Sequence, residues 1–273
     1  MLWLHVMAVV VVSYLLGSVN ASILVSRKIF KVDIRAYGSG NAGSTNAFRV
    51  MGKKWAIPVV IADLFKGGLA VWFGYCMLVG FDLADLGKLI AGLAVIIGHI
   101  FPVFFGFKGG KGVMTTAAVV AFVDPVVFAV VLGAFLVVAL ATRWVSLGSM
   151  VGATAIPVAM YYLHRQQGME TTLFVVLSTL IPIIVIAMHR ANIQRIFAGT
   201  ESRFSFKGKS IMEKIKTGTA DVTARTTCTT KRLTAKFDDV CKKTVSLTNA
   251  TTATLRRSAY RMRMKRRGMA GGN

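Results

Sequence analysis

The sequence is short of charged residues and of cysteine, and each shortage excludes a class of protein. Charged residues make up 16% of the 273 positions, whereas an ordinary soluble domain has about 25%. The three cysteines, Cys76, Cys228 and Cys241, form no CxxC pair and no Cys/His spacing typical of a metal site. We therefore expect neither a small soluble domain nor a zinc or redox centre.

Apolar runs take the place of the missing charges, since 55% of the residues are hydrophobic. The runs approach the roughly 17–25 residues that cross a bilayer. They lie at approximately 3–25, 55–80, 86–105, 112–123, 125–141, 144–163 and 171–189. Breaks at Asp124-Pro125 and Thr142-Arg143 leave two short segments, so 112–141 is either two tilted spans or one re-entrant hairpin. The first run is longer than a signal-peptide core and is interpreted as a retained span.

The net charge of +22 is explained by membrane topology, because lysine and arginine accumulate in cytoplasmic loops. With seven spans and the N-terminus outside, the inward loops hold 14 lysines and arginines and the outward loops hold two. We predict an all-α integral membrane protein of seven transmembrane helices, with the C-terminus cytoplasmic. A five-span alternative, with 112–141 as a shallow hairpin, gives the same sidedness.

Composition divides the chain after residue 207. We expect 1–207 to be the membrane-embedded domain and 208–273 to be a basic cytoplasmic tail, disordered or partly helical. The tail carries 16 basic and four acidic residues. Solvation or loose attraction to anionic lipid heads explains it more simply than nucleic-acid binding does.

Three polar stretches fall on the same predicted cytoplasmic face, each next to a span. They read "YGSGNAGSTNAFR" (37–49), "GHIFPVFFGFKGGKGVMTT" (98–116) and "HRANIQRIFAGTESR" (189–203). The first offers glycines, neutral hydrogen-bonding groups and Arg49, a combination that suits a phosphate. A simple polar turn, with Arg49 as a marker of the inner side, explains this stretch alone equally well.

The second stretch offers Lys108, Lys111 and the start of a helix at Thr115 and Thr116, where anions are favoured. It is not a Walker A loop, because Phe105 stands where the first glycine is needed and a glycine follows Lys111. We interpret it as a phosphate cradle, with a flexible inside loop as the alternative.

In the third stretch, His189 and Asn192 are three residues apart and share a helix face. Either this pair belongs to a site or His189 is an ordinary interfacial residue. Glu201 is expected to pair with a nearby arginine.

Charged groups also occur within the spans. Asp63 and Lys66 are expected to form a structural ion pair, because unpaired charges at that depth are costly. His99, just before an expected kink at Phe101-Pro102, either caps a carbonyl or faces the site.

These three stretches resemble the signature motifs of the acyl-phosphate-dependent glycerol-3-phosphate acyltransferases, the PlsY type, over roughly residues 3–207. The resemblance implies a bacterial inner-membrane enzyme that moves a fatty acyl group from acyl phosphate to the 1-hydroxyl of glycerol 3-phosphate. The products would be lysophosphatidic acid and inorganic phosphate, with no metal or cofactor. The chain contains no GxSxG elbow and no HxxxxD motif.

Carried over motif by motif, the resemblance assigns catalysis to His189, Asn192, Lys111 and Ser39. It assigns substrate binding to Ser39, Asn41, Thr45, Asn46, Arg49, Lys108, Gly109, Gly110, Lys111, Thr115, His189 and Asn192. The proton of the hydroxyl would pass to His189 or, in the interpretation that we favour, to a substrate phosphate. Besides membrane lipids and the two substrates, no partner is expected, and the protein is expected to be monomeric.

Two other functions remain open from the sequence. The broken segments over 112–141 and the charges of Asp63 and Lys66 would suit a transporter of an organic anion, although its site should then lie at midplane. The basic tail alone would suit a membrane-tethered protein that binds nucleic acid.

Overall fold

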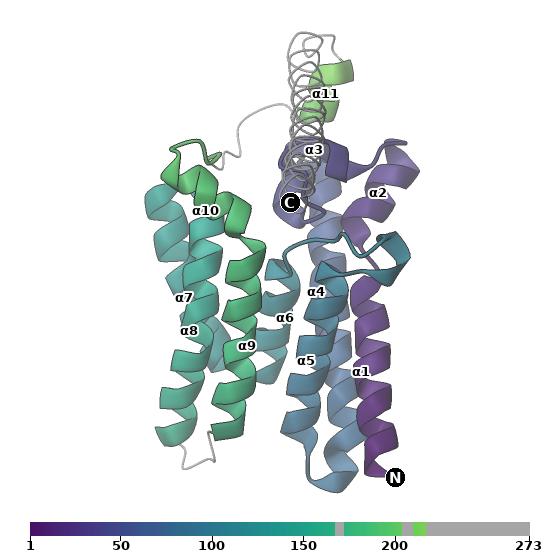
Figure 1. Cartoon of the computed structure of the whole chain (residues 1–273), viewed down its shortest axis with the longest axis vertical. Helices are drawn as coiled ribbons and strands as arrows, with labels where there is room; N and C mark the ends of the chain where they lie inside the picture. Colours follow the sequence, from purple (N-terminus) through teal and green to yellow (C-terminus); the bar gives the residue numbers. More distant parts are fainter. Residues whose placement is uncertain (167–171, 204–209, 217–273) are drawn as a thin grey trace, which may run out of the picture. The chain divides into compact units, whose positions relative to one another are not determined.

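A computed structural model describes residues 1–166, 172–203 and 210–216 of the chain, and the account below concerns the compact unit Met1–Lys214. Apolar helices build this unit (Figure 1). They are α1 (Leu2–Ser18), α4 (Lys53–Leu78), α5 (Ala84–Ile100), α6 (Val113–Val123), α7 (Pro125–Thr142), α8 (Val145–Gln166) and α9 (Thr172–Met188). Shorter elements are α2 (Ala21–Ile29), α3 (Ser44–Met51), α10 (Arg190–Phe197), α11 (Ile211–Lys216), η1 (Ile34–Ala36), η2 (Val79–Phe81) and η3 (Val103–Phe105).

The helices fall into two packed groups. The first contains α1, α4 and α5, the second contains α7, α8 and α9, and α6 lies between them (Figure 1). Glycines set the close packing of the first group. A Cβ added at Gly17 would lie 2.2 Å from the Val95 carbonyl oxygen, and one added at Gly98 would lie 2.2 Å from that of Tyr14. Small residues of this kind are typical of helix contacts within membranes, where backbones approach closely.

Length and composition show an integral membrane protein with five or six spans in the described residues. Five segments are long and apolar enough to cross a bilayer, and a sixth is the bent pair of α9 and α10, with a 55° bend. Of the seven predicted spans, the fourth does not reach this length, because α6 has only 11 residues. Large side chains such as Trp72, Val137 and Leu140 are exposed along the helices, as a lipid-facing surface requires.

The predicted breaks at Asp124 and Arg143 are confirmed. The Asp124 carboxylate accepts hydrogen bonds from the backbone N–H groups of Val126 and Val127 at 2.8 and 3.0 Å, so it caps α7. Arg143 ends α7 in the left-handed conformation, with φ of 61°. Helix α7 is by itself long and apolar enough to cross a bilayer, and α6 is not, so the choice between two spans and a hairpin over 112–141 stays a prediction.

The predicted kink at Phe101-Pro102 is wrong, because α5 ends at Ile100 and the chain turns back. The N–H of Gly109 donates to the Ile100 carbonyl at 3.0 Å, and that of Gly110 donates to the His99 carbonyl at 3.1 Å. The loop 106–112 therefore runs back along the last turn of α5. Helix α6 therefore starts inside the bundle, and a short helix is enough to reach the other end of the bundle.

The predicted tail, 208–273, lies outside the described residues except for 210–216. There Ser210 and Glu213 form a capping box at the start of α11. The N–H of Glu213 donates to the Ser210 hydroxyl at 3.2 Å, and the N–H of Ser210 donates to the Glu213 carboxylate at 2.7 Å. The boundary at 207 stays a prediction.

Candidate active site

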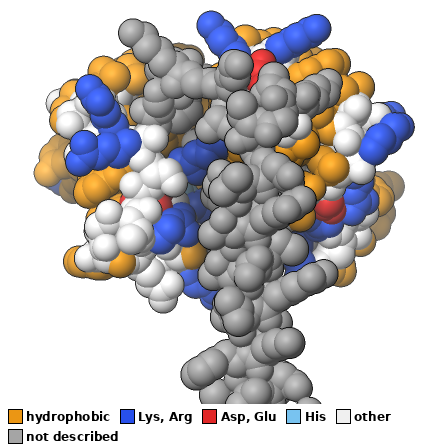
Figure 2. Space-filling model, turned by 90° about the horizontal axis from the view of Figure 1, so that it is seen from above, with side chains coloured by type: hydrophobic (Ala, Val, Ile, Leu, Met, Phe, Trp, Pro, Cys, Tyr) orange, Lys and Arg blue, Asp and Glu red, His pale blue; other side chains and the backbone are white. Residues whose placement is uncertain are grey.

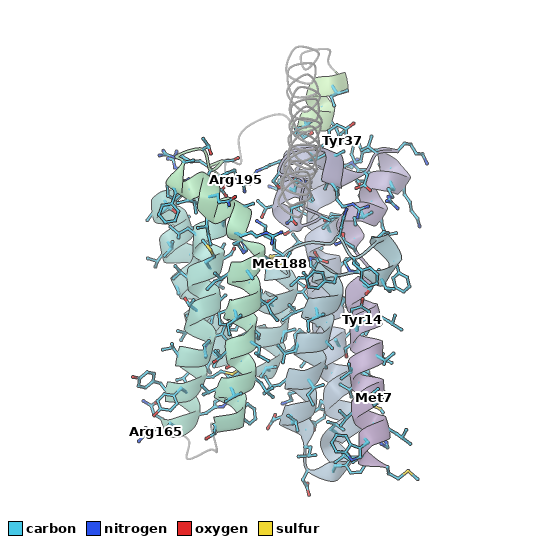
Figure 3. All side chains as sticks on the ribbon, in the orientation of Figure 1. Met7, Tyr14, Tyr37, Arg165, Met188 and Arg195 are labelled. Atoms are coloured by element: carbon cyan, nitrogen blue, oxygen red, sulfur yellow. The ribbon has the colours of Figure 1, made fainter. Side chains whose placement is uncertain are left out.

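A polar cavity of about 100 Å³ opens among the three polar stretches at one end of the bundle. Figure 3 labels Tyr37 and Arg195 near this end and Met7 and Arg165 near the opposite end. Lysine and arginine side chains also gather on this end face, seen from above in Figure 2. From the three stretches the cavity is lined by Ser39, Asn41, Gly43, Ser44, Thr45, Asn46, Arg49, His99, Lys111, Gly112, Val113, Met114, His189, Asn192 and Glu201.

Asn46 holds the first stretch in shape. Its side-chain oxygen accepts from the N–H of Ser39 at 2.9 Å, and its amide donates to the carbonyls of Tyr37 and Asn41 at 3.1 and 2.9 Å. Gly38 has φ of 60°, and a Cβ there would lie 2.3 Å from the Asn46 oxygen, so only glycine fits. The buried amide of Asn46 is thus occupied by backbone groups, and its role is to form the loop.

The glycines of the second stretch serve packing against α5. A Cβ at Gly109 would lie 2.0 Å from the His99 carbonyl oxygen, and one at Gly110 would lie 2.1 Å from the His99 Nε2 atom. Their N–H groups already donate to α5 carbonyls. A direct contact between these two glycines and an anion stays a prediction.

Arg35 holds the same loop from its outer side. Its guanidinium donates to the carbonyls of Phe105 and Lys108 at 2.8 and 2.9 Å, and it pairs with Asp33 at 2.7 Å. Hydrogen bonds from Arg35 hold the pKa of the Asp33 carboxyl well below its usual range. The Lys108 side chain is exposed and does not line the cavity.

A chain of hydrogen bonds joins the second and third stretches. The Lys111 ammonium donates to the side-chain oxygen of Asn192. The Asn192 amide in turn donates to Glu201 at 2.7 Å. Glu201 also accepts from the Ser146 hydroxyl and from Arg195, both at 2.7 Å. Because Glu201 accepts the Asn192 N–H, the oxygen of Asn192 must face Lys111.

His189 is buried where α9 meets α10, and its tautomer follows from its contacts. Its Nδ1 lies 2.7 Å from the Val185 carbonyl oxygen, which can only accept, so Nδ1 carries the hydrogen. In the uncharged ring, Nε2 is then the nitrogen that can accept a hydrogen bond.

Charge is concentrated around Lys111. Burial, followed by the charge of Arg195, lowers the pKa of Lys111 to about 8. Burial also lowers the pKa of Arg49 below its ordinary value. For Glu201, burial acts to raise the pKa, but hydrogen bonds from Ser146, Asn192 and Arg195 outweigh it and hold the pKa below its usual range. The cavity is thus cationic around Lys111, with Glu201 as an anchored carboxylate beside it.

The low pKa of Lys111 predicts an alkaline limb in the pH profile. Lys111 is charged below about pH 8 and loses its charge above that pH. We expect kcat/KM, which reports the free enzyme, to fall about tenfold per pH unit above pH 8. The Lys111→Arg variant keeps its charge throughout, so the limb should disappear whatever its absolute rate. A limb of equal position in this variant would contradict the assignment.

Most of the predicted site residues meet at the cavity, and four do not line it. Those at the cavity are Ser39, Asn41, Thr45, Asn46, Arg49, Lys111, His189 and Asn192. Those that do not line it are Lys108, Gly109, Gly110 and Thr115. Thr115 is fully buried, and its backbone packs against Gly67 of α4.

Sequence reasoning missed the contribution of α7 and α8. Phe135, Ser146 and Ser149 line the cavity from these helices. The two serines are three residues apart in an apolar segment, and this spacing is the only feature of the sequence that could have indicated their place at the cavity. Asp63, which the sequence suggested as half of a structural pair, also lines the cavity.

A second, apolar cavity of about 260 Å³ adjoins the first. Val113, Met114, Phe135 and Ser149 line both. The rest of its lining is Leu64, Thr116, Ala117, Val120, Phe128, Val131, Leu132, Gly152, Ala153, Ile156 and Val185. We call this space the apolar groove. The pair of spaces can accept a molecule with an anionic head and a long apolar tail.

In the described parts of the chain, no three His, Cys, Asp or Glu side chains gather in a way that could hold a metal ion.

Known proteins resemble this chain over most of its length. The family model described as Glycerol-3-phosphate acyltransferase matches residues 7–199. The glycerol-3-phosphate acyltransferase of Chlorobaculum tepidum is 38% identical over 232 residues, covering 75% of this chain and 98% of that protein. The one from Clostridioides difficile is 40% identical over 201 residues, covering 73% and 95%.

Solved structures agree with the sequence relatives. The crystal structure of PlsY, an integral membrane glycerol 3-phosphate acyltransferase, in its glycerol 3-phosphate form has a TM-score of 0.65 at 33% identity. The match covers 73% of this chain and 96% of that one. The lysophosphatidic acid form of PlsY gives a TM-score of 0.62 at 31% identity, covering 74% and 96%.

Proposed function

The chain belongs to the glycerol-3-phosphate acyltransferase family and is an integral membrane enzyme that produces lysophosphatidic acid, and we propose that its acyl donor is a fatty acyl phosphate. The observation that carries this proposal is that the cationic cavity and the apolar groove adjoin and share four lining residues. An acyl phosphate has a dianionic head and an apolar tail joined at the reacting carbonyl. Its head fits the cavity and its tail fits the groove, so its carbonyl would lie at the residues that line both.

Positioning and charge can supply the chemistry. The 1-hydroxyl oxygen of glycerol 3-phosphate bonds to the carbonyl carbon, the bond from that carbon to the phosphate oxygen breaks, and inorganic phosphate leaves. Lys111 and Arg49 are placed to stabilise negative charge on the phosphates. Because phosphate is a good leaving group, no protein nucleophile is required, and holding the two substrates in line is the main contribution.

We assign acceptance of the hydroxyl proton to a phosphate oxygen of the substrate. The ring of His189 is buried and shares the cavity with the Lys111 ammonium, so a positive charge on this ring would be costly. The unprotonated Nε2 of His189 is suited to orient the hydroxyl group through a hydrogen bond.

The donor assignment is tested with purified full-length protein and labelled glycerol 3-phosphate. We expect labelled lysophosphatidic acid with palmitoyl phosphate and none with palmitoyl-CoA, with release of one inorganic phosphate per product. Product from palmitoyl-CoA at a comparable rate would overturn the acyl phosphate assignment while leaving the acyltransferase activity intact.

For membrane topology, we propose seven crossings of a bacterial inner membrane, with the N-terminus outside and the cavity facing the cytoplasm. Support comes from the ring of His164, near the end of α8, whose Nε2 lies 3.0 Å from the Asp124 carboxylate. The end of α6 therefore lies level with the far end of α8. At about 1.5 Å per residue, α6 spans only about 16 Å, and the inward turn of 106–112 supplies the rest of the depth.

The groove predicts control of acyl-chain length at Gly152. A Cβ there would lie 3.3 Å from the Phe135 Cβ and 3.4 Å from the Val131 carbonyl oxygen, so a larger side chain would fill the groove. We expect Gly152→Leu to lower kcat/KM for palmitoyl phosphate at least tenfold and to spare octanoyl phosphate. Gly133→Leu on α7 is the matched control, because its Cβ would meet nothing within 4 Å. Equal losses with both chain lengths would contradict the assignment of the groove.

A further inference from the structure

We propose that Asp63, Lys66 and His99, which we call the buried charge cluster, are positioning residues for acyl transfer. They support the loop 106–112 from inside the bundle and thereby fix Lys111. The resemblance of the sequence to its family gives them no role, and the sequence alone suggested a structural ion pair. Three observations carry the inference: the contacts of Lys66, the position of His99 beneath the loop, and the opening of the cavity onto Asp63 and His99.

Lys66 ties three helices together at one point. Its ammonium lies 2.9 Å from the Asp63 carboxylate and 2.8 Å from Nδ1 of His99. It also donates to the carbonyls of Gly17 and Val19 at 3.2 and 3.0 Å, where the chain breaks between α1 and α2. Because an ammonium can only donate, Nδ1 of His99 must accept, which fixes the orientation of the ring.

The ring of His99 lies directly under the loop. An added Cβ at Gly110 would lie 2.1 Å from His99 Nε2, and the Gly110 N–H donates to the His99 carbonyl. Lys111 is the next residue, and its side chain points to Asn192 in the cavity. A change in the ring of His99 is thus transmitted through one residue to the cation of the site.

Burial shows that the cluster is costly unless its partners are all present. The exposed fractions of Asp63, Lys66 and His99 are 1%, 7% and 3%. Removing one partner of such a pair leaves an uncompensated charge, whereas removing both charges is often tolerated. A purely structural pair could therefore be replaced as a unit, but a support for the loop could not.

This difference defines the experiment. Full-length wild-type protein is compared with Lys66→Met, with Asp63→Asn/Lys66→Met and with His99→Asn. His99→Asn keeps an acceptor near the position of Nδ1 but removes the ring under Gly110. The matched control is Asp85→Asn/Lys88→Met, which removes an exposed pair of the same spacing with a 2.7 Å contact. Thermal unfolding, kcat, KM and the pH profile are measured for each.

We expect Lys66→Met to lose both stability and activity. The double variant should regain the unfolding midpoint while its kcat stays at least tenfold below wild type. His99→Asn should unfold near the wild-type temperature, with kcat at least tenfold lower and with the alkaline limb moved to higher pH as Lys111 becomes solvated. The control pair should match wild type in every measurement.

Recovery of wild-type kcat in the double variant, or wild-type kcat with an unmoved limb in His99→Asn, would reduce the cluster to a structural ion pair. The assay rests on the proposed acyl phosphate donor. Wild-type protein run in parallel separates the two proposals, because failure of the donor assignment would abolish its activity as well.

Discussion

Replacement of Lys111 by methionine is expected to lower kcat/KM by about 10²–10³, the usual cost of removing one group that stabilises developing charge. Lys111 is the only lysine among the described residues that line the cavity. It is half-buried and oriented by Asn192, so water cannot readily replace it. Methionine keeps the length and the apolar stem of the side chain and removes the charge alone.

The measurement is steady-state kinetics with each substrate varied in turn, together with thermal unfolding. We expect the loss chiefly in kcat and an unfolding midpoint close to that of wild type, since the half-buried Lys111 ammonium bonds to Asn192 and pairs with no carboxylate among the described residues. Lys28→Met on α2 is the control, because Lys28 is exposed and does not line the cavity. Wild-type turnover by Lys111→Met would remove Lys111 from the mechanism.

Arg49→Ala is expected to produce the second largest loss, mainly as a higher KM for glycerol 3-phosphate. Arg49 belongs to the first stretch, of which no residue lines the apolar groove, whereas the second stretch continues into the groove at Val113 and Met114. We therefore propose that Arg49 binds the phosphate of the substrate that lacks a tail. A hydrogen bond to a charged group contributes roughly 1.5–3 kcal/mol, which corresponds to about a 10- to 150-fold change in KM. Bidentate contacts between arginine and phosphate lie at the upper end.

The lysine replacement sharpens this test. Arg49→Lys keeps the charge but loses the planar fork, so we expect it to recover only part of the affinity. Arg190→Ala serves as the control, because Arg190 is an exposed arginine outside the cavity, at the start of α10. If Arg49→Ala raised the KM for acyl phosphate and left that for glycerol 3-phosphate unchanged, the assignment of the two phosphates would be reversed.

Hydropathy and local sequence explain why much of the fold could be predicted. The apolar runs correspond to α1, α4, α5, α7, α8 and α9, and the breaks at Asp124 and Arg143 follow from a capping carboxylate, proline and helix-ending geometry. The short run 112–123 likewise corresponds to α6 (Val113–Val123), but hydropathy could not show how so short a helix is placed in the bundle. That placement depends on the inward turn of 106–112, which is held by hydrogen bonds to the end of α5.

In the site, too, the sequence predicts some features and the fold determines others. Residues of all three polar stretches meet at one cavity, as the common face of the stretches predicts. Which groups remain available there depends on contacts that spacing does not encode. The side-chain amide of Asn46 is already hydrogen-bonded to the backbone of its own loop. The Glu201 carboxylate is oriented by Ser146, 55 positions earlier in the chain.

The sequence by itself determined that the chain is embedded in a membrane, that its cationic connectors share one side, and which family it resembles, because hydropathy, charge and short motifs are local properties. Only the tertiary structure decided that Lys66 joins α1, α4 and α5, that His99 lies under Gly110, and that the polar cavity adjoins an apolar groove. These features arise from packing between distant segments, where the loss of hydration forces each buried polar group to find a partner wherever the fold provides one.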